Sequence, residues 1–201
     1  MIAIIDYGAG NLFGVSNALK QFHKEVAITS DKEMIRAADH VILPGVGSFK
    51  DAMDSIKASG LIETVYEVID KKTPFLGICV GLQMCFEHSE EGDAAGLGIF
   101  PGNIKKFPVE RCKKVPQIGW NRVKTKDSPL FLDLPDDYFY FVHSYYLEAK
   151  NRDEVIATSE YGIPFDCAYQ RENVFLTQFH PEKSGKTGLK LLENFLAVEK
   201  K

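Results

Sequence analysis

Three short apolar runs constrain the fold of this chain more than any other feature. They are "IAIID" (2–6), "HVILPG" (40–45) and "PFLGI" (74–78), and each contains or closely precedes a glycine. Runs that are apolar at successive positions, rather than at alternate ones, are typical of strands buried on both faces. Segments with helical periodicity lie between these runs. We therefore predict an α/β fold with a mostly parallel central sheet covered by helices on both faces.

The other elements of the first half follow from similar patterns. A further strand is expected at 25–30, and helices are expected at 12–22, 31–39, 48–60 and 61–72. Asp31 and Ser48 are candidate N-caps, and Asp51 follows Ser48 at the spacing of an acidic capping box. Gly60 is expected to end the helix that Ser48 begins.

The second half of the chain does not alternate strands and helices; it has many strand-like segments and little helix. Strands are expected within 98–107, 115–125, 138–149, 154–162 and 165–179, and "RENV" (171–174) is a candidate hairpin turn. A final helix is expected at 184–200, with a core-facing stripe made of Leu189, Leu192, Phe195 and Leu196. Because no linker or repeat interrupts the chain, we expect residues 1–201 to form a single domain.

Composition excludes several classes of function. The net charge of −4 and the pI near 5.8 do not favour a nucleic-acid partner. The first residues lack the pattern of a secretory signal, and no apolar run reaches membrane-spanning length. The four cysteines have no spacing typical of a metal site, so we expect reduced thiols, a cytoplasmic location, and neither metal nor cofactor.

Two glycine-rich loops follow predicted strands. Gly8 and Gly10 suggest a dinucleotide-binding turn, but Phe13 stands where that motif requires its third glycine. A tight turn between strand and helix explains them better. The loop "PGVGSF" (44–49) lies where α/β sheets bind ligands, and its glycines would let a backbone N–H face an oxyanion. A plain connecting loop would have the same composition.

Cys79 lies between Gly77 and Gly81, where a predicted strand meets a predicted helix. A buried cysteine is usually an inert core residue, and we interpret Cys85, Cys112 and Cys167 in that way. The sequence G-I-C-V-G, however, has the form of a nucleophile elbow, in which small neighbours permit a sharp turn. The start of the helix would favour the thiolate, and the Val80 N–H would become an oxyanion donor.

A nucleophilic cysteine requires a base and a group that orients the base. His180 ends a predicted strand and Glu182 follows it, so an extended segment would place both side chains on one side. A carboxylate there would fix the imidazole tautomer. His143 is the rival base, although no acid follows it closely. The other histidines, His23, His40 and His88, are expected at the surface.

Three motifs in one order carry a family resemblance: "PGVGSF" (44–49), "GICVGLQ" (77–83) and "QFHPEKSG" (178–185). With them the sequence resembles the class I (triad) glutamine amidotransferases, over essentially the whole chain. The motifs "IDYGAGN" (5–11), "PQIGWN" (116–121) and "YFVHSYY" (140–146) are similar to those of the glutaminase subunits of imidazole glycerol phosphate synthase, an enzyme of histidine biosynthesis. The resemblance implies a flavodoxin-like class I glutaminase fold, with no synthetase domain fused to it.

The resemblance also implies roles for particular residues. Cys79 would attack the side-chain amide of glutamine, with His180 as proton carrier and Glu182 as its orienting group. The oxyanion would be held by Val80, Val46 and Gly47, and glutamine by Gln83, Ser144 and Tyr145. The partner would be a (β/α)8-barrel cyclase, which would receive the ammonia and form imidazole glycerol phosphate and an aminoimidazole carboxamide ribotide. The residues that would face this partner are Trp120, Asn121 and Lys183.

Other interpretations of the same residues remain open. A paralogous glutaminase would feed ammonia to a different acceptor, such as a sugar-modifying amidotransferase. Peptidase-like and stress-response proteins of similar fold also carry an elbow cysteine, but a histidine usually follows it, where this chain has Val80. A catalytically idle regulatory subunit would not need the complete set of cysteine, histidine and glutamate.

Overall fold

The computed structural model describes residues 1–134 and 137–200. Its centre is a parallel sheet in the strand order β2-β1-β3-β4-β13, which is the doubly wound order 2-1-3-4-5 of flavodoxin-like folds. The five strands are β1 (Ile2–Ile5), β2 (Val26–Thr29), β3 (His40–Gly45), β4 (Phe75–Cys79) and β13 (Val174–Thr177). The predicted parallel sheet is therefore confirmed.

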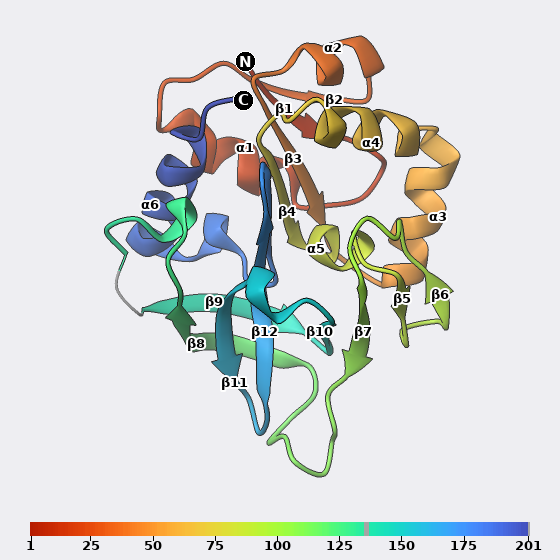
Figure 1. The fold of residues 1–201 in the computed structure, drawn as a ribbon, viewed down its shortest axis with the longest axis vertical. Helices are drawn as coiled ribbons and strands as arrows, with labels where there is room; N and C mark the ends of the chain where they lie inside the picture. Colours follow the sequence, from red (N-terminus) through yellow and green to blue (C-terminus); the bar gives the residue numbers. More distant parts are fainter. Residues whose placement is uncertain (135–136, 201) are drawn as a thin grey trace.

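Helices flank this sheet on two sides. They are α1 (Leu12–Lys20), α2 (Lys32–Ala37), α3 (Phe49–Ser59), α4 (Ile62–Asp70), α5 (Val80–Met84) and α6 (Gly185–Leu196). Figure 1 shows α1 and α6 together on one side of β1, β3 and β4, with α3 and α4 on the other. The predicted caps are confirmed, because Asp31 accepts from two backbone N–H groups, Ser48 accepts from the Asp51 N–H, and Gly60 adopts a left-handed conformation.

The second half extends the sheet with mainly antiparallel strands. These are β5 (His88–Ser89), β6 (Ala94–Ala95), β7 (Gly102–Lys106), β8 (Gln117–Thr125), β9 (Tyr138–His143), β10 (Tyr145–Ala149), β11 (Val155–Glu160) and β12 (Pro164–Arg171). The hairpin predicted at "RENV" is present, since Arg171 pairs with Val174 across a two-residue turn. Short 3-10 helices also occur in the part of the chain that the structure describes: η1 (Pro129–Phe131), η2 (Arg152–Glu154) and η3 (Pro181–Lys183).

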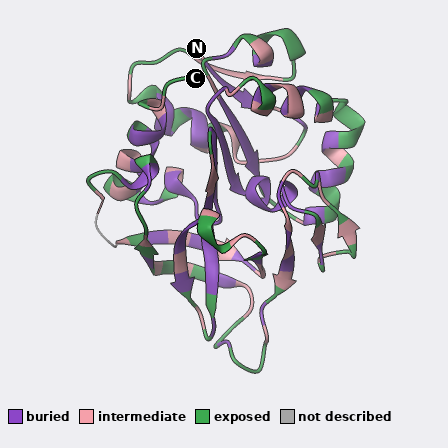
Figure 2. Ribbon diagram, viewed as in Figure 1, coloured by how far each residue is buried: buried purple, intermediate pink, exposed green. Residues whose placement is uncertain are grey.

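The central strands are the most buried part of the molecule, as the purple ribbon at the middle of Figure 2 shows. The predicted stripe of α6 is only partly correct. Leu192 and Phe195 are fully buried, but Leu191 takes the place expected for Leu189, which is half-buried, as is Leu196. Within the described residues, no helix has the length and apolar character needed to cross a membrane.

Candidate active site

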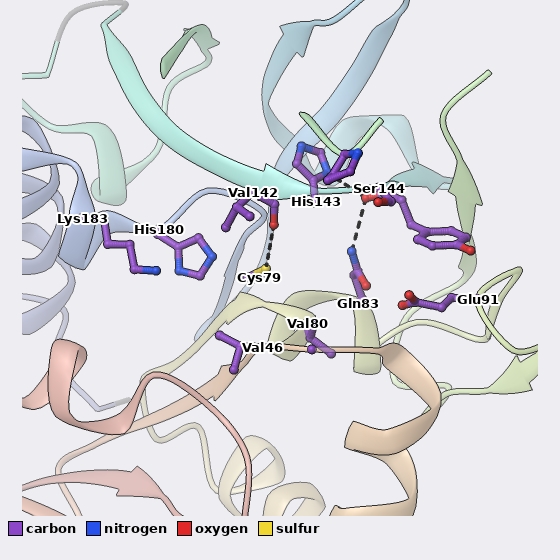
Figure 3. A pocket seen from close by; sticks show the side chains of 13 residues that line it. Val46, Cys79, Val80, Gln83, Glu91, Val142, His143, Ser144, His180 and Lys183 are labelled. Carbon is purple, nitrogen blue, oxygen red and sulfur yellow. Dashed lines mark hydrogen bonds between the residues drawn. The ribbon is translucent and has the colours of Figure 1, made fainter. Parts of the chain in front are cut away.

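A pocket of about 370 Å³ opens at the carboxyl ends of β3 and β4, the position where open α/β sheets bind ligands. Gly45 and Cys79 are paired at the ends of these two strands, so the glycine-rich loop after β3 lies beside the cysteine. Figure 3 shows the side chains around the opening. The lining residues are Val46, Gly47, Cys79, Val80, Gln83, Glu91, Pro116, Val142, His143, Ser144, Tyr145, His180 and Lys183.

Cys79 is the residue at which β4 turns into α5, as the elbow prediction requires. Its φ of +56° is unusual for a residue with a side chain, and its neighbours explain how the turn is accommodated. A Cβ on Gly81 would lie 2.0 Å from the carbonyl oxygen of Leu43, and a Cβ on Gly77 would lie 2.6 Å from Leu176. The two glycines therefore let the turn pack against its neighbours. The sulfur is nearly buried, with Cys79 4% exposed.

His180 and Glu182 form a buried pair beside this cysteine. His180 Nδ1 lies 2.8 Å from Glu182 Oε1, and each side chain is only 1% exposed. The segment is a 3-10 turn beginning at Pro181, so the expectation of an extended segment was wrong, although the pairing it predicted is present. Figure 3 shows the His180 ring beside the Cys79 sulfur. Among the described residues, His180 Nε2 has no hydrogen-bond partner.

The pKa values of this pair move against the effect of burial. Burial lowers the pKa of His180, but its interactions with Cys79 and Glu182 are stronger and raise that pKa to about 9. Burial likewise raises the pKa of Glu182, while His180 and the Asn11 amide bring it below its ordinary value. The site therefore favours an imidazolium held by a carboxylate.

Asn11 is a site residue that the sequence interpretation missed. Its Nδ2 donates to Glu182 Oε1 over 2.9 Å, so the loop after β1 supports the carboxylate that holds His180. The "GAGN" turn could have suggested a site residue, because it too follows the carboxyl end of a central strand. Glu91, which lines the pocket and accepts from the Phe49 N–H, was also missed.

His143, the rival base, is already occupied by hydrogen bonds. Its Nδ1 lies 2.7 Å from the Tyr145 carbonyl oxygen, and its Nε2 lies 3.0 Å from the side-chain amide of Gln117. Burial lowers the pKa of His143 to about 4, so the ring is neutral and its single proton binds the carbonyl through Nδ1. Nε2 then accepts from Gln117, whose amide nitrogen must face the ring.

The residues expected around a substrate lie together. Val46, Gly47 and Val80 line the pocket at its β3 and α5 side, and Gly47 has a φ of +88°. Gln83, Ser144 and Tyr145 also line it, and Gln83 Nε2 donates to the Tyr145 carbonyl oxygen over 3.3 Å. The geometry thus gathers both predicted sets around Cys79, while their roles stay predictions.

Of the three residues expected to face a partner, Lys183 lines the pocket, whereas Trp120 and Asn121 line a separate hollow beside β8 and β11. Lys183 is exposed at the edge of the pocket, with Nζ 5.9 Å from the centre of the Tyr140 ring, and Trp120 packs edge-on against the same ring. Trp120 is 53% exposed and lies within β8, inside the segment 115–125 where a strand was expected. Asn121 uses its amide internally, donating to the Glu160 carbonyl oxygen.

Three smaller expectations are corrected or refined by the structure. His40 is half-buried, because its ring packs on Phe195 and its Nε2 lies 3.0 Å from the Val198 carbonyl oxygen. His23 is exposed and His88 is half-buried. The helix after the elbow ends at Met84, and Cys85 is its C-cap. The core placement of Cys85, Cys112 and Cys167 is confirmed.

The doubly wound fold places a cysteine at an elbow beside a buried histidine–glutamate pair. The glutamine amidotransferase class-I family model matches residues 3–198. The chain belongs to that family. Solved structures with the same fold include PurLQS from Thermotoga maritima (TM-score 0.77, 16% identity, 97% of this chain and 96% of that chain). The glutaminase domain of Trypanosoma brucei CTPS has a TM-score of 0.66 and 13% identity, over 98% of this chain and 94% of that one.

Curated relatives show to which branch of this family the chain belongs. The imidazole glycerol phosphate synthase subunit HisH of Methanocaldococcus jannaschii is 49% identical over 98% of this chain and 100% of its own length. The subunit of the same name from Dechloromonas aromatica is 47% identical over 97% and 95%. Relatives of this similarity place the chain in the HisH branch of the family.

Proposed function

We propose that this chain is the glutaminase subunit of an imidazole glycerol phosphate synthase. It hydrolyses glutamine to glutamate and ammonia, and a (β/α)8-barrel cyclase subunit uses the ammonia in histidine biosynthesis. The observation that carries the proposal is the meeting of the elbow residue Cys79 with the buried His180–Glu182 pair in one pocket. The HisH names of relatives matched over their full length support the pathway. A biosynthetic role of this kind fits the cytoplasm.

The reaction divides into two acyl transfers. The Cys79 thiolate attacks the side-chain amide carbon of glutamine, and His180 gives its proton to the departing nitrogen as the C–N bond breaks. This step leaves a γ-glutamyl thioester and ammonia. His180, now neutral, takes a proton from water, and the resulting hydroxide equivalent displaces the sulfur to release glutamate. The Glu182 carboxylate keeps Nδ1 protonated throughout, so that Nε2 carries the moving proton.

An oxyanion forms in each transfer and needs donors at the correct position. The Val80 N–H, at the start of α5, is one donor in this proposal. The second donor comes from the backbone at Val46 and Gly47, which lies beside Cys79. A Cβ on Gly47 would meet no atom within 4 Å. That open space would let the peptide plane turn when a partner or substrate requires it.

The partner surface is the exposed part of β8 and β9 beside the pocket. Trp120, Ile118 and Tyr138 are large apolar side chains that are each more than half exposed there. Exposed aromatic residues of this kind are enriched at protein interfaces. Because Trp120 and Lys183 both contact Tyr140, this surface continues to the edge of the pocket. A cyclase bound here would receive ammonia directly from the site.

The test separates production of ammonia from its use. In the complex with the cyclase, His180→Asn should lower glutamine-dependent synthesis at least about 100-fold, because the proton carrier is lost. The same complex should keep its rate with ammonium salt at alkaline pH, because free ammonia reaches the cyclase without the glutaminase.

His88→Asn is a matched control, since His88 also pairs with a carboxylate, Asp93, but lies outside the pocket. It should leave both reactions unchanged. Near-normal glutamine-dependent turnover in folded, assembled His180→Asn would contradict the assignment. Loss of the ammonium-dependent reaction as well would contradict the division of labour between the subunits.

A further inference from the structure

The Cys79 sulfur has a polar neighbour that the mechanism above does not use. Gln178 is fully buried, and its Nε2 lies 3.6 Å from Cys79 Sγ. The register of the sheet explains this contact. Thr177 at the end of β13 pairs with Ile78 of β4, so the next residue of each strand, Gln178 and Cys79, emerge side by side.

The direction of this contact determines its chemistry. An amide nitrogen facing the sulfur would donate to a thiolate, whereas an amide oxygen would repel it, and a half-turn of the side chain exchanges the two. A backbone carbonyl cannot be exchanged in this way. The Tyr145 carbonyl oxygen, 3.3 Å from Gln83, can only accept, so the Gln83 atom facing it is the nitrogen Nε2.

The orientation of the Gln178 amide follows from the orientation of Gln83. Gln83 Nε2 also lies 2.9 Å from the Gln178 side chain, which must therefore present its oxygen Oε1 to Gln83. The other end of the Gln178 amide, its NH2 group, then faces Cys79 Sγ. Both hydrogens of Gln83 Nε2 are used in this chain of bonds, so Gln83 meets a substrate as an acceptor, through Oε1.

We propose that Gln178 is a catalytic residue that donates a hydrogen bond to the Cys79 thiolate, in an orientation set through Gln83 by the Tyr145 carbonyl group. The proposal rests on the glutaminase function proposed above. A donor facing sulfur favours the charged form, and the effect is larger in a buried site. The Val142 carbonyl oxygen lies 4.0 Å from Sγ and can accept only from the neutral thiol. The two protonation states therefore have different neighbours.

Other ionisable groups also act on the sulfur, and a test must keep them constant. His180 with Glu182 behind it, Tyr7 after β1, His143 at the end of β9, Glu91 and Lys183 line the pocket or interact with Cys79. Replacing Gln178 alone leaves all of them in place. The change between variants then reports the amide.

The experiment measures the rate of Cys79 alkylation by iodoacetamide against pH in the full chain, with peptide mass mapping to identify the labelled cysteine. In Gln178→Leu and Gln178→Met, which are of similar size but lack a donor, the midpoint of the curve should rise by about one to two pH units. At pH values well below the wild-type midpoint, the rate should fall roughly 10- to 100-fold. Asn194→Leu is the matched control, because it removes another buried amide that donates to two carbonyl oxygens, in α6.

The control should keep the wild-type curve, and thermal unfolding shows which variants are folded. A wild-type curve in either folded Gln178 variant would overturn the proposal. If both Gln178 variants fail to fold, Gln83→Leu decides, because it frees the Gln178 amide to rotate and should raise the midpoint by a smaller amount. Cys79→Ser distinguishes the two proposals. If this variant still hydrolyses glutamine, the glutaminase mechanism is refuted. If Cys79→Ser abolishes glutamine hydrolysis but the Gln178 variants keep the wild-type alkylation curve, only the role of Gln178 is refuted.

Discussion

His180 and Glu182 are both excluded from water, yet each carries the charge that burial disfavours. Each charge stabilises the other, because the imidazolium and the carboxylate lie 2.8 Å apart. Asn11 adds a hydrogen-bond donor to the same carboxylate oxygen. A buried pair of this kind stabilises its charged form only while both partners are present. The protonation state of His180 is therefore a property of the pair, and a change at Glu182 should be visible in the titration of His180.

The pH dependence of glutamine hydrolysis tests this coupling. His180 must be protonated to release ammonia, so kcat/KM should fall as pH rises through its pKa of about 9. Glu182→Gln removes a charge that raises this pKa, so the alkaline limb should move to lower pH by at least about one unit. The measurement is glutamate release by the complex between about pH 6 and about pH 10, on both sides of this pKa.

Asn11→Ala should move the limb in the same direction as Glu182→Gln but by less, because it removes a neutral donor rather than a charge. An alkaline limb at the same pH in wild type and Glu182→Gln would show that the group titrating there is not His180.

The position of α5 after β4 depends on the absence of a side chain at Gly81. The Gly81 backbone packs against β3 so closely that a Cβ would lie 2.0 Å from the Leu43 carbonyl oxygen. Backbone atoms of a central strand cannot move aside without breaking the sheet. The close approach of α5 to β3 directly after Cys79 therefore requires glycine at position 81.

Gly81→Ala should therefore lower the free energy of unfolding by about 3 kcal/mol, at the upper end of what overpacking costs, although alanine favours helices. Gly98→Ala provides the comparison, because its Cβ would meet no atom within 4 Å and only its φ of +64° opposes the change. That strain costs about 1–2 kcal/mol. Denaturant unfolding measures both values, and equal losses in the two variants would mean that close packing at the elbow is unimportant.

On the scale of the whole molecule, the parallel half supplies Cys79 and the antiparallel half supplies the proposed partner surface. The two halves meet at the pocket, where β9 and β10 lie across from the elbow and contribute Val142, His143 and Tyr145 to its lining. The exposed side chains of β8 lie within reach of this junction through Tyr140. A partner covering them would also cover the pocket.

Binding of the cyclase should bury Trp120 and shift its fluorescence emission to shorter wavelength. The signal from this chain is unambiguous because Trp120 is its single tryptophan. A titration with a tryptophan-free cyclase measures the shift, and Trp120→Ala should weaken binding by more than about 1 kcal/mol, as expected of an interface anchor. An unchanged spectrum while sedimentation shows a complex would place the interface elsewhere.

Local patterns in the sequence predicted the elements and the main site residues. The apolar runs determined the parallel strands, Asp31 and Ser48 determined two helix starts, and the glycines around Cys79 determined the elbow. Each of these depends on residues within a few positions of one another, so the chain alone contains the information. The same locality explains the errors: whether Leu189 or Leu191 of α6 faces the core depends on segments far away in the sequence.

Contacts between distant segments were decided only by the tertiary structure. Asn11 and Glu182 are 171 positions apart, and Gln178 meets Cys79 across 99 positions. No periodicity or motif relates such residues, because their contact follows from strand order and register. The direction of the Gln178 amide depends further on one backbone carbonyl group, that of Tyr145. Local patterns therefore indicate which groups can do the chemistry and where the capped helices begin. Packing selects the side chains that hold the thiolate, imidazole and carboxylate in place, because hydrogen bonds form between the atoms that the assembled sheet brings together.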